Sequence, residues 1–197
     1  METPENDIQK AAIPEAPVNA SPETAAKAPV AADIPSEPEV PATPVIPAGV
    51  FGSALAGAGL TVENLGNDVI GTEMVRTTVD DLLKVAAFLK DKQGFDLLLS
   101  CTGIDWKDRL ESVYFLYSTT KHVYLSLRVN AVDDHSPSVY PIWNAADWHE
   151  RETYDLFGIQ YDGHPNLIRI LMPDDWLGHP LRKDYKLNDP RLVWNER

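Results

Sequence analysis

Cysteine is nearly absent from this 197-residue sequence, which contains only Cys101. A disulfide needs two thiols, and zinc or iron–sulfur sites built on cysteine need several, so neither is expected within this chain alone. A lone cysteine inside an apolar run is usually a small buried hydrophobic side chain. We predict that role for Cys101.

Positive charge is also scarce, with 17 Lys and Arg against 30 Asp and Glu and a net charge of −13 at pH 7. Such an acidic surface repels a phosphate backbone, so we expect no nucleic-acid binding. No apolar run approaches the ~18 residues of a membrane-spanning helix. The first residues have neither the basic nor the apolar region of a secretory signal. The expectation is an intracellular protein that does not cross a membrane.

Proline, by contrast, is concentrated at the start: ten of the 16 prolines precede residue 48, and no aromatic residue precedes Phe51. Proline interrupts helices and sheet ladders, and a segment with few large apolar side chains cannot offset the entropy of ordering. We therefore predict two parts. Residues 1–50 form a disordered, acidic tail rich in Pro and Ala, and residues 51–197 form one α+β domain.

Early in that domain the pattern predicts two helices and a strand. Residues 51–60 are small and apolar, although their glycines weaken a helix. Residues 67–75 suit a strand with a turn or bulge at Gly71. A clearer helix runs from Thr78 to Gly94, its C-terminal stop. Thr77 or Thr78 would cap it, Asp80 and Asp81 would occupy its first turn, and its apolar positions are Leu82, Val85, Ala86 and Leu89.

Three strands follow, at residues 95–106, 111–120 and 121–130, and the last two alternate apolar and polar side chains. A hairpin turn at 119–121 would join them. The fold class predicted from this order is α+β, with a helix packed on a mostly antiparallel sheet.

Beyond a loop at 133–141, a second helix is predicted from Pro141 to Phe157, ended by Gly158. Short strands at 159–161 and 167–172 and an extended irregular C-terminal segment follow it. On this helix Arg151 is four residues from both Asp147 and Asp155, a spacing that allows ion pairs. Glu150 falls on the apolar face, so it must reach an edge, meet a buried donor, or pair with a cation from a second protein.

The polar cluster at 143–185 fits no catalytic geometry. His149-Glu150 lacks the second histidine of a zinc protease helix, because position 153 is Thr. Glu150 and Glu152 lie on different helix faces and suit no carboxylate pair. A zinc site from His149, His164 and His179 has no specific spacing. We expect no catalytic, cofactor-binding or metal-binding residue, and instead a recognition surface of Trp, Tyr and Arg.

Several motifs in this stretch resemble a known family. They are Glu150-Arg151-Glu152, Asp155-Leu156-Phe157-Gly158, Gly163-His164-Pro165, Arg169, Leu171, and Gly178-His179-Pro180-Leu181-Arg182-Lys183-Asp184-Tyr185. Together they closely resemble the C-type subunit of NADH-quinone oxidoreductase, which belongs to the class of about 30 kDa in respiratory complex I. The resemblance covers about residues 60 to 190 and departs at Ile168, where the family usually carries a basic residue.

The resemblance implies a cofactor-free, non-catalytic structural subunit in the quinone module of the hydrophilic arm. It would support electron transfer from NADH to quinone coupled to ion translocation. NADH, FMN, iron–sulfur clusters and quinone would belong to partner subunits. The partners would be the quinone-site subunit and the adjacent iron–sulfur subunit. In a bacterium the chain would be peripheral, on the cytoplasmic side of the inner membrane, and associated with the membrane only through the complex.

The charged and aromatic residues of these motifs are then candidates for contacts between subunits. They are Glu150, Arg151, Glu152, Asp155, His164, Arg169, His179, Arg182, Lys183, Asp184 and Tyr185. Three alternatives remain open: the same subunit in a ferredoxin-dependent or hydrogenase complex, a stand-alone metal-dependent enzyme, and a free acidic adaptor.

Overall fold

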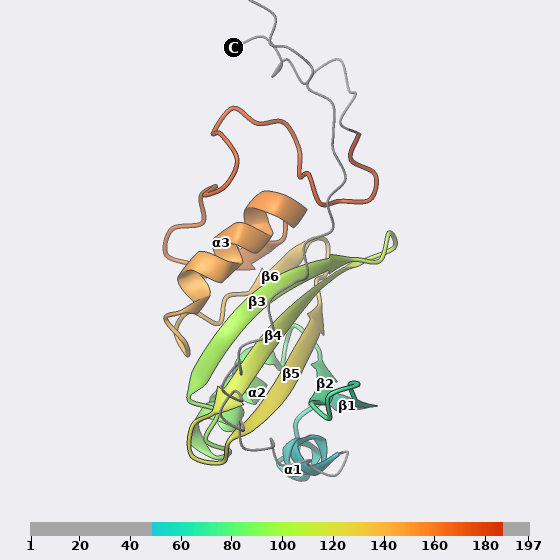
Figure 1. The fold of residues 1–197 in the computed structure, drawn as a ribbon, viewed down its shortest axis with the longest axis vertical. Helices are drawn as coiled ribbons and strands as arrows, with labels where there is room; N and C mark the ends of the chain where they lie inside the picture. The colour runs from blue at the N-terminus through green and yellow to red at the C-terminus, as the bar shows by residue number, and fades with distance from the viewer. Residues whose placement is uncertain (1–48, 187–197) are drawn as a thin grey trace, which may run out of the picture. The chain divides into compact units, whose positions relative to one another are not determined.

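The computed structural model describes residues 49–186 (Figure 1). The predicted tail at 1–50 therefore lies almost wholly outside the described residues. The elements, in chain order, are α1 (Val50–Gly57), β1 (Val62–Asn67), β2 (Glu73–Thr77), α2 (Leu82–Asp91), β3 (Leu97–Asp105), β4 (Leu110–Ser118), β5 (Val123–Asn130), β6 (His135–Pro137), α3 (Ala146–Phe157) and β7 (Gln160–Asp162).

The main sheet has five strands in the order β1-β2-β5-β4-β3. Strands β3, β4 and β5 form the predicted antiparallel meander. Strand β2 then pairs with β5 in parallel, and β1 pairs with β2 antiparallel. The α+β class with a mostly antiparallel sheet is confirmed, with one parallel pair and a separate two-stranded sheet of β6 and β7.

The helices pack on one face of this sheet. The predicted apolar positions of α2 are fully buried and share a core with Leu116, Leu125 and Leu127. Helix α3 reaches the same face near β3, where Gly103 lies directly under Phe157. In Figure 1 the strands β3–β5 lie in front of α2, and α3 lies alongside β3. Because side chains alternate along a strand, the opposite face of the sheet carries no helix of the described chain.

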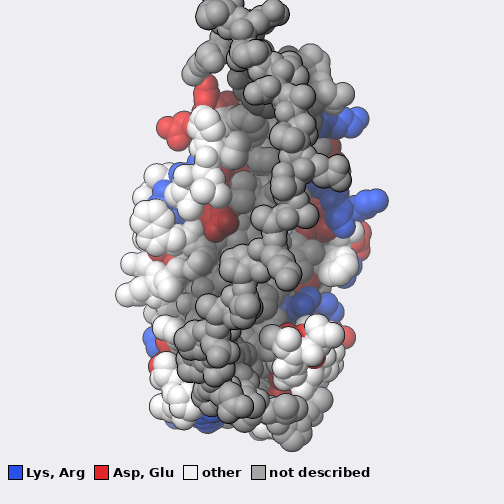
Figure 2. Space-filling model, viewed as in Figure 1, with Lys and Arg blue, Asp and Glu red and all other residues white. Residues whose placement is uncertain are grey.

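The surface seen from this side mixes charges of both signs. In the space-filling view of Figure 2, the Lys and Arg side chains of the described residues are interspersed with Asp and Glu side chains. Uncharged side chains lie between them. The described residues on this side therefore form no large area of a single charge.

The structure corrects several predicted boundaries. Helix α2 begins at Leu82 rather than Thr78. Thr77 ends β2 instead of capping the helix, and its hydroxyl donates to the Thr61 carbonyl at 2.9 Å. The single strand predicted at 67–75 is a hairpin whose turn contains Gly71 at φ 87°. The Asp68 carboxylate holds that turn by accepting from the N–H groups of residues 70 and 72.

Helix α3 begins at Ala146 rather than Pro141. Residues 139–145 instead form turns in which the Trp143 N–H donates to the Val139 carbonyl at 3.0 Å. The Trp143 indole donates to the Phe95 carbonyl at 3.1 Å, which fixes this turn to the start of β3. Gly158 ends the helix as predicted, at φ 80°.

The close approach of α3 to β3 requires a glycine. A Cβ at position 103 would lie 2.7 Å from the Phe157 ring and 3.0 Å from the Thr153 methyl group. We predict that Gly103→Ala lowers the free energy of unfolding by about 1 to 3 kcal/mol, because α3 must shift away from the sheet. Urea unfolding measures this effect.

Gly57→Ala is the matched control, since nothing lies within 4 Å of a Cβ at that helical position. It should be neutral or slightly stabilising. Equal stability of the two variants would contradict the close packing of α3 on β3.

Candidate functional site

The C-terminal end of α3 organises the segment that follows it. The last carbonyl groups of a helix have no partner within the helix and need donors from elsewhere. Here the segment 178–182 returns to this helix end and supplies them. The donors are the His179 ring Nδ1 to the Asp155 carbonyl (2.9 Å), the Leu181 N–H to the Leu156 carbonyl (3.0 Å), and the Arg182 Nε to the Phe157 carbonyl (2.5 Å).

The Asp155 carboxylate holds a second part of the same segment. It is fully buried and pairs with the Arg169 guanidinium at 2.7 Å. One of its oxygens also accepts the N–H groups of Ile170, Leu171 and Met172 at 3.1, 2.8 and 2.8 Å. These bonds explain why residues 167–172 form no strand, because their N–H groups point at a side chain. Burial acts to raise the pKa of Asp155, but the hydrogen bonds and Arg169 outweigh it and leave the pKa below its usual value.

His179 is part of this helix cap. Its ring lies so close to Gly158 that a Cβ there would be 2.6 Å from the imidazole. The pKa of His179 lies below its usual value, chiefly because burial disfavours the charged ring, with Arg169 and Arg182 acting in the same direction. The neutral ring donates from Nδ1 to the Asp155 carbonyl. The geometry therefore gives His179 a structural hydrogen bond.

Arg151 does not form the predicted ion pairs along α3. It donates instead to the carbonyl groups of Ile168 and Arg169, at 3.1 and 3.4 Å, and lies 5.2 Å above the Trp148 ring. Asp147 meets His164, whose Nε2 lies 3.3 Å from the carboxylate. The side chain of His164 is fully buried, so it too holds the segment to the helix.

Arg182 and Lys183 attach the end of the segment to the sheet and its neighbouring loop. Arg182 pairs with Asp134 at 2.6 Å, and the Lys183 N–H donates to the Asp105 carboxylate at 2.7 Å. The cavity between them, of about 390 Å³, is lined by equal numbers of acids and bases. Its lining is Asp105, Lys107, Asp108, Arg109, Leu110, Asp134, Arg182, Lys183 and Asp184.

Glu150 meets donors from its own chain, which decides among the three predicted alternatives. Its carboxylate is fully buried and accepts from the Ser138 hydroxyl at 2.6 Å and the Val139 N–H at 2.8 Å. Burial raises its pKa to about 7, against the opposing effect of these two hydrogen bonds. Glu150 therefore ties α3 to the loop at 138–139 and does not reach the surface.

The predicted contact residues thus divide into two groups. Most face inward and hold the segment: Glu150, Arg151, Asp155, His164, Arg169, His179 and Arg182. Glu152, Lys183 and Asp184 are exposed, and Tyr185 is half-buried against Gly178. Among residues 49–186, no three His, Cys, Asp or Glu side chains converge in a metal-binding arrangement.

The exposed side chains of the segment are largely apolar, and the sequence reasoning missed them. Trp148 is 63% exposed, and four apolar residues between 168 and 181 are 52–57% exposed. They are Ile168, Leu171, Leu177 and Leu181. The available signal was their position: large apolar residues in a segment without helical or strand periodicity have no face to bury.

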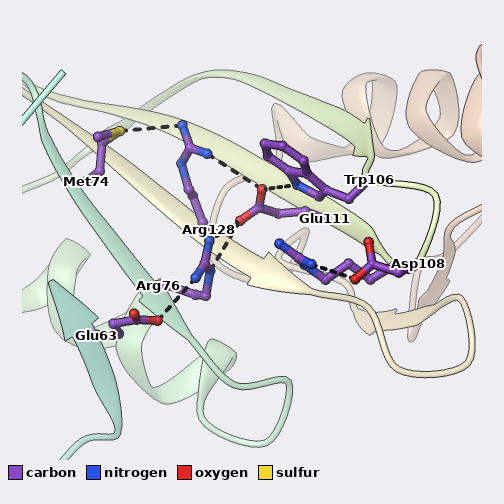
Figure 3. Close-up of polar contacts among 8 residues, drawn as sticks. Glu63, Met74, Arg76, Trp106, Asp108, Glu111 and Arg128 are labelled. Atoms are coloured by element: carbon purple, nitrogen blue, oxygen red, sulfur yellow. Dashed lines mark hydrogen bonds and ion pairs between the residues drawn. The ribbon is translucent and has the colours of Figure 1, made fainter. Parts of the chain in front are cut away.

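A second polar site, also missed, lies on the helix-free face of the sheet (Figure 3). Glu111 is fully buried and pairs with Arg76 at 3.2 Å and with Arg128 at 3.6 Å. The Trp106 indole donates to the same carboxylate at 2.9 Å. The cations come from β2 and β5 and the acid from β4, so only the strand order brings them together.

Comparison with known proteins identifies a family. The family model described as the 30 Kd subunit of respiratory-chain NADH dehydrogenase matches residues 75–191. The C-type subunit of NADH-quinone oxidoreductase from Nocardioides sp. is 48% identical over 116 residues, 55% of this chain and 46% of that protein. The same subunit of Mycobacterium marinum is 50% identical over 114 residues, 54% of this chain and 48% of that protein. This chain spans about half the length of these curated relatives.

Solved structures share the fold. A trypsin-resistant fragment of Nqo5 aligns with a TM-score of 0.51 and 28% identity, covering 58% of this chain and 95% of that fragment. A chain of membrane-bound sulfane sulfur reductase, an archaeal respiratory membrane complex, aligns with a TM-score of 0.59 and 21% identity. That alignment covers 71% of this chain and 85% of the other.

Removing the Asp155 carboxylate should release the segment it holds. We predict that Asp155→Ala lowers the free energy of unfolding by about 3 kcal/mol, because Arg169 loses its buried partner. Amide exchange at residues 168–172 should accelerate, measured by hydrogen–deuterium exchange with mass spectrometry. Asp162→Ala, at an exposed pair with His135, should cost about 0.5 kcal/mol or less. Unchanged exchange at 168–172 would refute the anchoring role.

Glu150 should make stability depend on pH. The unfolded carboxyl loses its proton near its ordinary pKa of 4.5, whereas the folded one keeps it to about pH 7. The folded state binds more protons in this window, so stability should fall by ~3 kcal/mol as pH rises through it.

Glu150→Gln keeps the shape of the side chain and removes this loss. Urea unfolding at pH 5 and pH 8 should show a smaller decrease for the variant than for the unchanged protein. Glu152→Gln, the same change at an exposed position of α3, should keep the original decrease. An identical decrease in all three proteins would assign the pH dependence to other groups.

Proposed function

Because this chain belongs to the family of the 30 Kd subunit of respiratory-chain NADH dehydrogenase, we propose that it is a structural, non-catalytic subunit of NADH-quinone oxidoreductase. It works in the quinone module of the hydrophilic arm and supports electron transfer from NADH to quinone coupled to ion translocation. The observation that carries this proposal is the folding of residues 163–185 onto α3 by the chain's own polar groups. Those groups build a shaped surface.

That surface has the character of a docking site. Trp148, Ile168, Leu171, Leu177 and Leu181 are all more than half exposed. Large exposed apolar side chains in one region mark interaction sites, and Trp and Arg are frequent anchors of interfaces. Arg151, held over Trp148, keeps the indole in a defined position. The buried apolar contacts would supply most of the affinity.

The exposed charged residues form the polar edge of this site. We assign direct contacts to Glu152, Lys183 and Asp184, which are exposed in the chain. Edge charges of this kind fix orientation and partner choice more than affinity. Glu150, Asp155, His164, Arg169, His179 and Arg182 act indirectly, by holding the surface in place.

The partners in this proposal are the quinone-site subunit and the adjacent iron–sulfur subunit. NADH, FMN, the iron–sulfur clusters and quinone belong to the partner subunits. In a bacterium the chain is peripheral, on the cytoplasmic side of the inner membrane. Among the described residues no helix has the length and apolar character to span a bilayer. Residues 1–50 are assigned to an acidic tail that precedes this subunit domain.

A second candidate is the same structural role in a related complex with another electron donor or acceptor. The observation that favours it is the shared fold with a chain of an archaeal sulfane sulfur reductase. Purifying the complex that contains this chain and assaying NADH:quinone reduction distinguishes the two. A stand-alone metal-dependent enzyme would instead show stoichiometric metal and turnover in the isolated chain.

Leu171→Asp should prevent stable incorporation into the complex, because it places a charge in an apolar contact. We expect at least about a tenfold loss of assembled subunit, measured on a native gel with quinone reductase activity. The isolated variant should unfold at nearly the same urea concentration, since the side chain is 57% exposed. Leu83→Asp, at an exposed position of α2, should assemble normally.

Glu152→Ala tests the polar edge of the same site. A moderate assembly defect is expected, with activity falling in proportion to the assembled subunit. Complete assembly with loss of activity would instead place chemistry in this chain and overturn the non-catalytic assignment.

A further inference from the structure

The helix-free face of the sheet has an apolar end. Directly paired residues of neighbouring strands share a face, and the register places Leu97, Tyr117 and Tyr124 in one row across β3, β4 and β5. The next row contains Phe115, paired with Ser126. Leu97, Phe115 and Tyr124 are 38–44% exposed, and the rings of Tyr117 and Tyr124 lie 4.7 Å apart.

The adjoining part of this face carries polar atoms without partners. Ser126, Arg128 and Asn130 are successive positions of β5 on this face. Each has a buried polar atom that makes no hydrogen bond with the described chain: Ser126 Oγ, Arg128 Nε and Asn130 Oδ1. Buried polar groups normally find a partner, so three in a row along one strand indicate an absent one.

Arg128 is the most incompletely paired group (Figure 3). Its Nη1 lies 3.6 Å from Glu111 and its Nη2 lies 3.5 Å from the Met74 sulfur, both long for hydrogen bonds. Arg76, by contrast, donates to Glu111 and to Glu63 at 3.2–3.3 Å. The side chain of Arg128 is 20% exposed, so an acceptor can reach its guanidinium group from outside.

We propose that this face is a second docking surface, occupied by a segment of another subunit. That segment places apolar side chains against Phe115 and Tyr124 and a carboxylate against Arg128. The surface is distinct from the one on residues 148–181, and the inference rests on the proposed function, because it requires an assembly of several subunits.

The size of the face argues for a segment of an already assembled partner. Four strands and three rows of side chains span roughly 15 by 15 Å, or a few hundred Å². A stable interface between free proteins needs about 800 Å² per partner. A second copy of this chain would therefore not remain bound through this face alone.

Charge argues against a lipid surface as the occupant. The two cations of this face, Arg76 and Arg128, are balanced by Glu63 and Glu111. Attraction to anionic lipid requires clusters of unbalanced Lys and Arg. One incompletely paired guanidinium beside aromatic rings fits a peptide carboxylate flanked by apolar side chains.

Photo-crosslinking in the assembled complex tests this directly. The photoreactive amino acid p-benzoylphenylalanine replaces Phe115 or Tyr124, with Leu83 on α2 as the control position. The expected result is a crosslink from 115 and 124, but not from 83, to one segment of another subunit. Crosslinks to residues 1–48 of the same chain, to a second copy, or to nothing would overturn the proposal.

Incorporation of the unsubstituted chain is measured first. Absence of that chain from the complex would defeat the proposed function, whereas normal incorporation without crosslinks defeats only the second docking surface.

Arg128→Gln and Tyr124→Ser test the energetic contribution of this face. Each should speed release of the chain from the complex in a salt wash by on the order of tenfold. Lys92→Gln, at an exposed position after α2, is the charge control. If Arg128→Gln also destabilises the isolated chain, Tyr124→Ser alone decides. Release at the unsubstituted rate for Tyr124→Ser would overturn the contact.

Discussion

The C-terminal end of α3 is the constraint on which the rest of the C-terminal structure depends. A helix that stops within a folded domain leaves carbonyl groups that must find donors. In this chain the donors come from His179, Leu181 and Arg182, more than twenty residues further along. The long segment between them cannot wander, because Asp155 fixes its middle through four hydrogen bonds. A stretch without regular secondary structure thereby obtains a defined shape.

Buried carboxylates make the other long-range connections of the fold, each with a different solution to its charge. Glu73 accepts the first N–H groups of α1, from Phe51 and Gly52, where the helix dipole favours an anion. Glu111 is neutralised by two arginines, and Glu150 by a raised pKa together with hydrogen bonds. Each acid joins segments 11 to 35 residues apart. Such clips specify one arrangement of the segments more than they add stability.

The parts of the fold that periodicity determines were predictable from the sequence. The apolar positions of α2, the three strands of the meander and the stop at Gly158 all follow from local pattern. The start of each helix did not, because it depends on tertiary partners: Thr77 belongs to a strand, and Trp143 is fixed to Phe95. Glu111 was missed for the same reason, since its partners come from strands that only the sheet order brings together. The motifs of residues 150–185 were recognised, but their polar groups had been assigned outward.

That inversion changes how the docking site recognises its partner. If its charged residues faced outward, recognition would rest on ion pairs, which salt screens and water solvates. Because Asp155, Arg169, His179 and Arg182 are used within the chain, the outer surface is left to Trp148, Ile168 and Leu171. Recognition then depends on the shape in which these apolar side chains are held, and that shape depends on buried polar contacts. A substitution at a buried carboxylate, far from any partner, would therefore act on the interface through its geometry.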